Sequence, residues 1–203
     1  MTFGEKQLTR WMELVRTTDD GIEAFWPSQI KSKTWICNEL EFKEHFRTCV
    51  IFGSWYGVLA DILTLRLKDT NILCNDIDKE AISWCMRKYH TDTNRMEEFT
   101  YETRVDLVIN TVTEHLTQEE YDKWYDNVPK GTYFVIQGNN DFKEPDHVRA
   151  TQTLEQFNNI NRVKNCLRSE YIEYEGPWDH IDNVPTTYKR FMTIGFKDHD
   201  RKN

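Results

Sequence analysis

The stretch CVIFGSWYG, at residues 49–57, decides the fold of this chain. Cys49 to Phe52 are all apolar, which is typical of a strand that is buried on both faces of a parallel sheet. Gly53 then allows a tight turn, and Val58 to Leu67 has the apolar spacing of a helix. A strand, a glycine turn and a helix in this order predict the start of an open α/β sheet.

The same alternation of strands and helices continues to the end of the chain. Because no helix separates the last two strands, they can pair antiparallel. The expected fold class is therefore α/β: a doubly wound, Rossmann-like, seven-stranded sheet that is mostly parallel, with the last strand antiparallel. After the first strand, the others are expected at 71–75, within 90–104, and at 105–109, 133–136, 171–175 and 191–196, with helices at 5–16, from 32, and at 58–67, 80–89, from 117, and at 154–160.

Apolar spacing also predicts which helix faces are buried. In the first helix, the side chains that follow the i, i+3, i+4, i+7 pattern and are expected to face the core are Leu8, Trp11, Met12 and Val15. The helix at 80–89 is expected to turn Cys85 and Met86 inward. The expected N-caps are Ser32, Asp78 and Thr117.

Composition disfavours several classes of protein. The chain has 203 residues, a net charge of −8 and no basic run, so a nucleic-acid partner is not favoured. Its apolar stretches are too short to cross a bilayer, so no membrane partner is expected. Five cysteines without a C-x-x-C pair and a polar amino terminus predict a cytoplasmic protein with reduced thiols. Residues 1–47 are expected to form a helical cap, and residues 48–203 one compact domain.

Polar or glycine clusters follow four of the expected strands. Since ligands of open α/β sheets bind beyond the carboxyl ends of the strands, these clusters predict one shared pocket and an enzyme with a nucleotide-like cofactor. The clusters are 53–57, 76–78, Asn110 and Thr111 with Glu114 and His115, and 137–140.

The glycine turn favours one kind of cofactor. In a dinucleotide-binding turn, the second glycine lets the backbone approach a pyrophosphate, and here that position is Trp55. An indole there obstructs phosphates but not S-adenosylmethionine (SAM), which has none. Asp76, at the end of the second strand, can accept hydrogen bonds from both ribose hydroxyls; the alternative is that it caps the next helix.

Three motifs together resemble the class I SAM-dependent methyltransferases, and look closest to small stand-alone members of bacteria and phages. They are VIFGSWYG at 50–57, CNDID at 74–78 and VDLVINTVTEHL at 105–116, within a resemblance that spans Thr48 to Lys197. The resemblance implies that residues 48–203 bind SAM, with S-adenosylhomocysteine (SAH) as product. The cofactor-binding residues it implies are Gly53, Trp55, Tyr56 and Gly57 at the methionine end, Asp76 at the ribose, Ile77, Asn94 and Met96 at adenine, and Asn110 and Thr111 at the methyl donor.

The remaining clusters provide candidates for chemistry. Glu114 and His115 are candidate catalytic bases, although in this motif the pair can instead brace a helix. No metal site is expected, because the histidines are scattered and form no H-x-x-x-H motif. The candidate substrate-binding residues are Gln137, Asn139, Asn140, His147, Trp178 and His180. Arg190 is expected at a solvated edge, with contact to an anionic group as the alternative.

These observations predict a SAM-dependent methyltransferase that acts on a small molecule or a protein by in-line methyl transfer. Members of this family usually have an acid two residues before the first glycine and a glycine in the middle of the turn, where this chain has Ile51 and Trp55. They also usually have an acid after the third strand, and no clear one is visible in this sequence. These departures keep open a SAM-binding protein with altered or no transferase activity. A dinucleotide-dependent oxidoreductase and a non-enzymatic interaction module are further alternatives. The methyl acceptor and the oligomeric state stay open.

Overall fold

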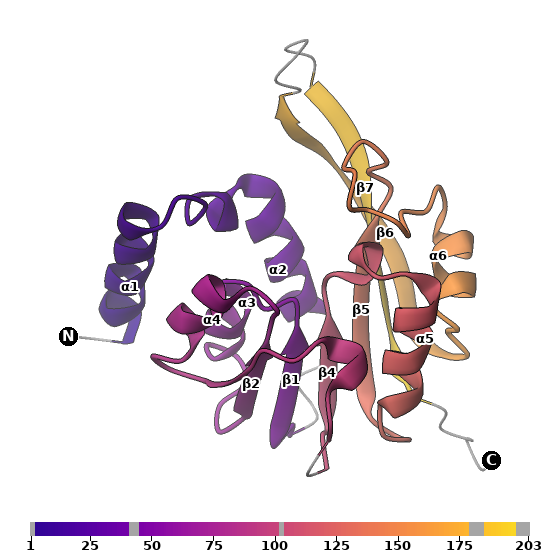
Figure 1. Ribbon diagram of the computed structural model, residues 1–203, viewed down its shortest axis with the longest axis horizontal. Coiled ribbons are helices and arrows are strands. Elements are labelled where there is room, and N and C mark those ends of the chain that lie inside the picture. The colour runs from indigo at the N-terminus through magenta and orange to yellow at the C-terminus, as the bar shows by residue number, and fades with distance from the viewer. Residues whose placement is uncertain (1–2, 41–44, 102–103, 179–184, 198–203) are drawn as a thin grey trace.

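A computed structural model, which describes residues 3–40, 45–101, 104–178 and 185–197, contains a seven-stranded sheet in the order β3-β2-β1-β4-β5-β7-β6 (Figure 1). Neighbouring strands from β3 to β5 are parallel, whereas β7 is antiparallel to both β5 and β6. The predicted fold class, including its reversed last strand, is confirmed. The strands are β1 (Thr48–Phe52), β2 (Asn71–Asn75), β3 (His90–Asp92), β4 (Leu107–Asn110), β5 (Tyr133–Asn139), β6 (Asn165–Trp178) and β7 (Pro185–Phe196).

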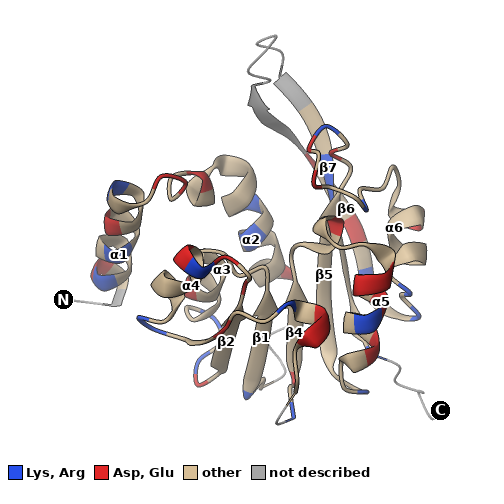
Figure 2. Cartoon of the chain, viewed as in Figure 1, with Lys and Arg blue, Asp and Glu red and all other residues tan. Residues whose placement is uncertain are grey.

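Helices cover both faces of this sheet. The long helices carry charged residues, whereas β1, β4 and β5 carry none (Figure 2), as strands that are buried on both faces require. The helices are α1 (Phe3–Thr17), α2 (Pro27–Glu39), α3 (Val58–Leu63), α4 (Lys79–Cys85), α5 (Gln118–Asn127) and α6 (Leu154–Ile160), with short 3₁₀ turns η1 (Glu23–Phe25), η2 (Met96–Glu98) and η3 (Thr113–His115).

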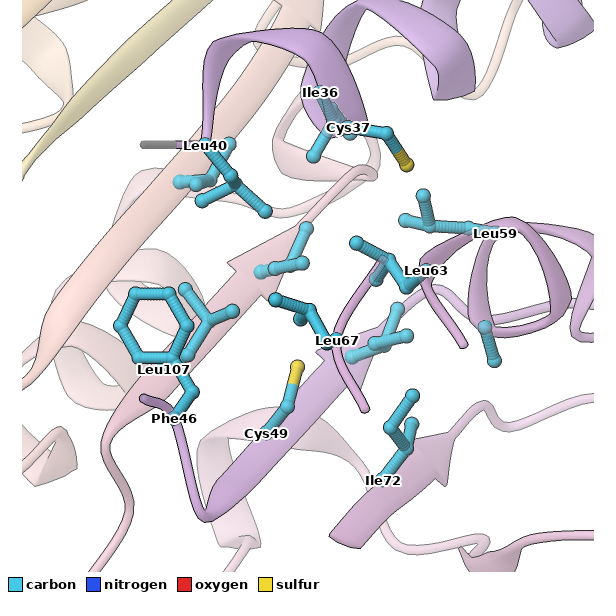
Figure 3. Packing of buried hydrophobic residues seen from close by; sticks show 14 of the residues in the cluster. Ile36, Cys37, Leu40, Phe46, Cys49, Leu59, Leu63, Leu67, Ile72 and Leu107 are labelled. Carbon is cyan, nitrogen blue, oxygen red and sulfur yellow. The ribbon is translucent and has the colours of Figure 1, made fainter. Parts of the chain in front are cut away.

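Alternate residues of each strand serve two cores. On one face, Ile36 of α2, Leu40 directly after this helix, and Leu59 and Leu63 of α3 pack over Cys49 and its neighbours (Figure 3). On the other face, aromatic residues of α5 and α6 pack against the side chains of β1, β4 and β5 that point the opposite way. The sheet is thus the middle of three layers, and only its strand ends are free to form a site.

Several predicted boundaries shift. The prediction that Ser32 caps the second helix is wrong, because α2 begins at Pro27, whose fixed φ suits the first turn of a helix. Asp78 and Thr117 are N-caps as predicted, and Thr117 forms a capping box with Glu120. Strand β5 extends to Asn139 because its pairing with β7 continues that far.

The predicted buried face of α1 is wrong except at Trp11, which is half-buried against a small apolar cluster that includes Leu14. Leu8, Met12 and Val15 are exposed, whereas Gln7 and Leu14 are buried. The cause is the side chain of Asp61 in α3, which is fully buried and draws the polar face of α1 inward. Met86, which was expected to face inward, is also exposed, because α4 ends at Cys85.

Asp61 is the centre of a polar network that fastens α1 to the sheet layer. Its Oδ2 accepts hydrogen bonds from Gln7 Nε2 at 2.5 Å, from Trp11 Nε1 at 2.8 Å and from the guanidinium of Arg10. Its Oδ1 accepts from Lys88 Nζ at 3.0 Å and from Tyr89 Oη at 2.6 Å. One buried carboxylate therefore joins α1, α3 and the segment that follows α4.

The amino-terminal residues divide between two cores. Leu14 and Ala24 belong to a small cluster with Tyr56, Val58, Ala81 and Trp84. In contrast, α2 belongs to the main core of the sheet. Within the described parts of the chain, no helix has the length and apolar character that a bilayer crossing requires.

Candidate functional site

The chain order reverses between β1 and β4, which lie side by side in the middle of the sheet. This is the switch point at which open α/β sheets bind ligands. The glycine turn follows β1, Asp76 follows β2, and Thr111 follows β4. The structure therefore brings together the strand ends that the sequence singled out.

The turn between β1 and α3 has three residues in the left-handed region. Gly53 has φ 68° and Gly57 has φ 76°, and between them Trp55 has φ 47°. A Cβ at Gly53 would lie 2.3 Å from Cγ1 of Val112, so only glycine lets this turn approach the segment after β4. Trp55 keeps the backbone conformation of a glycine position although it carries an indole.

Asp76 links this turn to the end of β2. Its Oδ2 accepts a hydrogen bond from the backbone N–H of Trp55 at 2.7 Å, and its Oδ1 accepts from the N–H of Asp78 at 3.0 Å. Asp78, not Asp76, caps α4. Partial burial raises the pKa of Asp76 above its ordinary value, although the hydrogen bonds from Asp78 and Trp55 oppose this shift.

The neighbouring adenine-side candidates occupy different environments. Ile77 is exposed beside Asp76, Asn94 is exposed after β3, and Met96 is buried. The sulfur of Met96 accepts a hydrogen bond from Nδ2 of Asn110 at 3.3 Å, which connects it to the end of β4.

The acid at the end of β3, Asp92, is a further site candidate that was not predicted from the sequence. The carboxylate of Asp92 accepts from Asn75 Nδ2 and from the N–H of Asn94, each at 2.9 Å. Its backbone carbonyl accepts from the N–H of Asp76 at 3.2 Å. Asp92 was missed because β3 is only three residues long and too short for a clear apolar pattern.

Thr111 lies against the glycine turn, and Asn110 precedes it at the end of β4. The hydroxyl of Thr111 donates to the carbonyl of Gly53 at 3.1 Å, and the fully buried Asn110 accepts from the N–H of Val112 at 3.0 Å. The hydroxyl of Ser54 is buried in the same turn and has no hydrogen-bond partner in the described parts of the chain. An unpartnered polar atom here fits a turn that completes its hydrogen bonds with a ligand.

A second group of polar side chains surrounds Glu114. Its Oε1 accepts from Nδ2 of Asn139 at 2.5 Å and from the guanidinium of Arg190 at 3.2 Å. Arg190 thus meets an anionic group, the alternative given for it, and it does not lie at a solvated edge, because the residue is only 7% exposed. The antiparallel pairing of β7 with β5 places Arg190 opposite Asn139, which is the last residue of β5.

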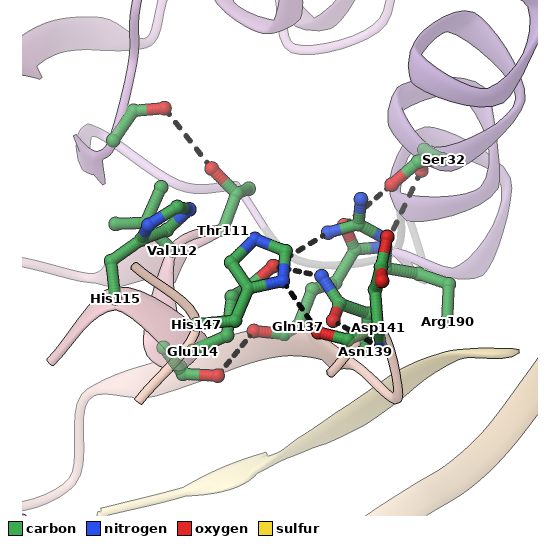
Figure 4. Close-up of polar contacts among 12 residues, drawn as sticks. Ser32, Thr111, Val112, Glu114, His115, Gln137, Asn139, Asp141, His147 and Arg190 are labelled. Atoms are coloured by element: carbon green, nitrogen blue, oxygen red, sulfur yellow. Dashed lines mark hydrogen bonds and ion pairs between the residues drawn. The ribbon is translucent and has the colours of Figure 1, made fainter. Parts of the chain in front are cut away.

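His115 and His147 meet beside Glu114 (Figure 4), with their ring centroids 4.7 Å apart. Nδ1 of His115 lies 2.8 Å from a carboxylate oxygen of Asp146. Nδ1 of His147 lies 2.9 Å from the backbone carbonyl of Asp141. Residues that follow two different strands thus build one small cluster.

The other predicted substrate-binding residues make internal contacts or lie away from the cluster. Gln137 Oε1 accepts from the hydroxyl of Ser32 at 2.7 Å, which holds α2 over the end of β5, and Asn140 Oδ1 accepts from the N–H of Lys189 at 2.6 Å. Trp178 is the last residue of β6, whereas the residue of β6 that pairs with Arg190 is Ile172. At ~3.3 Å per residue, Trp178 lies about 20 Å farther along the strand. His180 lies outside the described residues.

Lys33 of α2 also lies near this region. Its Nζ donates to Oε1 of Gln29 at 2.7 Å. Burial, together with the positive charge of Arg190, lowers the pKa of Lys33 from 10.5 to about 7. A surface hollow at the opposite edge of the sheet, lined by residues such as Phe46, Arg104 and Lys130, contains no predicted site residue.

Comparisons with known proteins give likenesses in structure alone. No protein-family model matches the chain, and no curated protein matches its sequence. The chain is similar to the N-methyltransferase NodS from Bradyrhizobium japonicum WM9, solved with SAH, at a TM-score of 0.65 and 14% identity over 94% of this chain and 99% of that chain. It is similar to a SAM-dependent methyltransferase from Archaeoglobus fulgidus, at a TM-score of 0.58 and 13% identity over 81% and 93%. It is also similar to the plantazolicin methyltransferase BpumL, solved with SAH, at a TM-score of 0.54 and 13% identity over 95% and 97%.

Proposed function

We propose that this chain, which has the fold of the class I SAM-dependent methyltransferases, binds SAM and transfers its methyl group to an acceptor. The observation that carries the proposal is the hydrogen bond between Asp76 and the N–H of Trp55. It sets a partly buried carboxylate beside a left-handed glycine turn at the switch point of the sheet.

The turn and the carboxylate have complementary roles. Gly53 to Gly57 hold the methionine end, and Tyr56 contributes through its backbone because its side chain is buried under α1. Each carboxylate oxygen of Asp76 accepts one backbone hydrogen bond and keeps a second lone pair. These lone pairs accept hydrogen bonds from the ribose hydroxyls. The bound SAH of two structural neighbours supports this choice of cofactor.

Adenine would lie between the ends of β2 and β3. Ile77 offers an exposed apolar surface there, and Asn94 and Asp92 offer polar groups for the edge of the base. Asn110 and Thr111 keep the end of β4 against Gly53, where the methyl group would be presented.

The acceptor would approach over the ends of β4 and β5. SAM carries an activated methyl group, so the protein contributes mainly proximity and orientation. Glu114 is already engaged by Asn139 and Arg190, which favours His115 over Glu114 as the group that meets the acceptor. Ser32 and Gln137 fix α2 beside this approach and thereby limit the size of the acceptor.

The class of acceptor follows from charge and from the neighbours. Acidic and basic residues are interspersed along the helices and loops of the ribbon (Figure 2), and the net charge is −8, which favours a small molecule or a protein over a nucleic acid. The neighbours are described as an N-methyltransferase and a methyltransferase of plantazolicin, which is consistent with this range. A SAM-binding protein without transferase activity is the second candidate, favoured by Trp55 in the turn.

Calorimetric titration of the full chain with SAM, SAH and NAD tests the cofactor. We expect SAM and SAH to bind and NAD not to bind. Replacement of Asp76 by Ala removes hydrogen bonds to a charged group, so it should weaken SAH binding by about 1–3 kcal/mol. Asp122→Ala, a change at a half-buried residue of α5, is the matched control and should bind SAH like the parent chain.

Two outcomes contradict the proposal. Binding of NAD without SAM would identify a dinucleotide enzyme, and equal SAH affinity in Asp76→Ala would remove Asp76 from the site. Binding of SAM with no methyl transfer to any acceptor in a broad panel would support the second candidate.

A further inference from the structure

Three potential metal ligands converge where the ends of β4 and β5 meet. Glu114 and His115 follow β4, and His147 follows β5. One carboxylate oxygen of Glu114 and one ring nitrogen from each histidine lie within 4.8 Å of one another. This spacing is close enough for one ion to contact all three after small side-chain adjustments, since bonds from a transition metal to nitrogen or oxygen are about 2.0–2.2 Å long.

Both histidines are oriented as metal ligands usually are. Metal-binding histidines commonly donate the N–H of their other ring nitrogen to a carboxylate or a backbone carbonyl. Here Nδ1 of His115 contacts the carboxylate of Asp146 at 2.8 Å, and Nδ1 of His147 contacts the carbonyl of Asp141 at 2.9 Å. These contacts favour the tautomer with the proton on Nδ1, which leaves Nε2 of each ring with a free lone pair.

The third ligand contains an unpartnered atom. Glu114 is only 2% exposed, and its Oε1 accepts from Asn139 and Arg190. Its Oε2 is buried and has no hydrogen-bond partner in the described parts of the chain. A buried carboxylate oxygen without a partner is costly, and a bound cation would remove that cost.

We propose that Glu114, His115 and His147 bind a divalent transition-metal ion. Two imidazole nitrogens and one carboxylate oxygen suit Zn²⁺, Fe²⁺, Co²⁺ or Mn²⁺, whereas Ca²⁺ and Mg²⁺ prefer oxygen ligands throughout. Three protein ligands leave coordination positions open, as catalytic metal sites do.

The surrounding charges are compatible with a cation. Arg190 contacts Oε1 of Glu114, so its guanidinium leaves the unpartnered Oε2 available to a metal. Asp146 adds a carboxylate behind His115 and offsets the positive charge of the guanidinium. His115 and His147 are both partly exposed, which gives the ion a route from solvent.

A bound ion would change the role of His115. As a ligand it cannot serve as the proton acceptor, and an acceptor oxygen in an open coordination position would instead have its pKa lowered by the metal. This role rests on the proposed function, whereas binding of the metal itself does not.

Titration of the full, chelator-treated chain with Co²⁺, in the absence of SAM and acceptor, tests the proposal. The visible absorption of Co²⁺ should show saturable binding with nitrogen and oxygen ligands, and calorimetry with Zn²⁺ should give the same stoichiometry. His115→Ala and His147→Ala should each lose this binding. Asp146→Asn, which removes the charged partner of His115, should weaken it by about 10–100-fold.

Matched controls separate this site from other ligands. His90→Ala changes an exposed histidine on β3, and Cys166→Ser removes an exposed thiol; neither should affect Co²⁺ binding. Glu114→Gln keeps the size of the side chain but removes its negative charge, so it should weaken Co²⁺ binding. Circular dichroism verifies that each variant is folded.

Binding that survives in folded His115→Ala and His147→Ala would overturn the proposal, as would the absence of saturable Co²⁺ and Zn²⁺ binding in the parent chain. Either result would leave His115 as a candidate base. Because SAM is absent from the titration, failure of this proposal is distinguishable from failure of the proposed methyltransferase function.

Discussion

Trp55 has a left-handed backbone conformation that is unfavourable for its large side chain. Its φ of 47° is unusual for a bulky residue, and its ring packs at 5.2 Å from that of Tyr56. The N–H of Trp55 is held by Asp76, so the surrounding turn imposes this conformation. The indole therefore occupies a glycine position without changing the path of the chain.

A pair of substitutions measures this strain. Trp55→Gly and Trp55→Ala both remove the indole, but only Ala retains a Cβ in the left-handed region. We expect Trp55→Gly to be more stable than Trp55→Ala by about 1 kcal/mol, the reverse of the usual order of these residues. Urea unfolding of both variants measures the difference, and equal or opposite stabilities would show that the turn relaxes.

Lys33 predicts a pH dependence of stability. Its pKa is lowered to about 7 in the folded chain, against 10.5 for a solvated lysine. Between these values the unfolded chain binds a proton that the folded chain lacks, so the free energy of unfolding rises with pH. Below about pH 7 both states are protonated and this dependence ends.

Urea unfolding of the parent chain and of Lys33→Met between about pH 7 and pH 9 checks this prediction. The parent should gain up to about 1.4 kcal/mol per pH unit relative to the variant. The difference between the two chains removes the opposing effect of buried thiols such as Cys37, whose pKa is raised to about 12 by burial. Parallel curves would mean that Lys33 is charged in the folded chain.

At the scale of elements, α1 is held by polar contacts more than by apolar ones. Asp61 receives side-chain hydrogen bonds from Gln7, Arg10 and Trp11 of this helix, while its apolar residues Leu8 and Met12 face solvent. The i, i+4 pattern of apolar residues was therefore a misleading guide to the buried face.

Asp61→Ala should destabilise the chain by about 3 kcal/mol, because it leaves Arg10 and Lys88 without their buried partner. Asp122→Ala is the control and should cost less than about 1 kcal/mol, because the side chain of Asp122 is 40% exposed and its contact with Arg162 is 3.5 Å long. Chemical unfolding gives both values, and hydrogen exchange should show faster exchange in α1 of Asp61→Ala. A loss as small as that of the control would show that Leu14 and its apolar neighbours hold the helix.

At the scale of the whole molecule, the predicted division at residue 47 can be compared with the cores. Five apolar residues between 27 and 47 belong to the main core: Trp35, Ile36, Cys37, Leu40 and Phe46. Burial of each such side chain contributes about 1.5–3 kcal/mol. The loss of all five would therefore lower the free energy of unfolding by an amount close to the total stability of a typical domain. In contrast, among the described residues before position 27, only Leu14 and Ala24 are buried apolar residues.

Two shortened chains test which division is correct. Residues 27–203 should fold with a lowered melting temperature, and residues 48–203 should not fold. Near-ultraviolet circular dichroism and thermal unfolding distinguish these results. Cooperative unfolding of residues 48–203 would support the division at residue 47 and show that α2 is dispensable to the core.

The sequence by itself determined the order of strands and helices, the reversed last strand, the caps at Asp78 and Thr117 and the grouping of Asp76 with the glycine turn. These features depend on local spacing and on the rule that the ends of parallel strands meet at one edge. Only the tertiary structure decided that Arg190 pairs with Glu114, 76 residues away, that His147 meets His115, and that α1 is buried by its polar face. Such contacts depend on the register of β5 with β7 and on buried charge, neither of which leaves a periodic pattern in the chain.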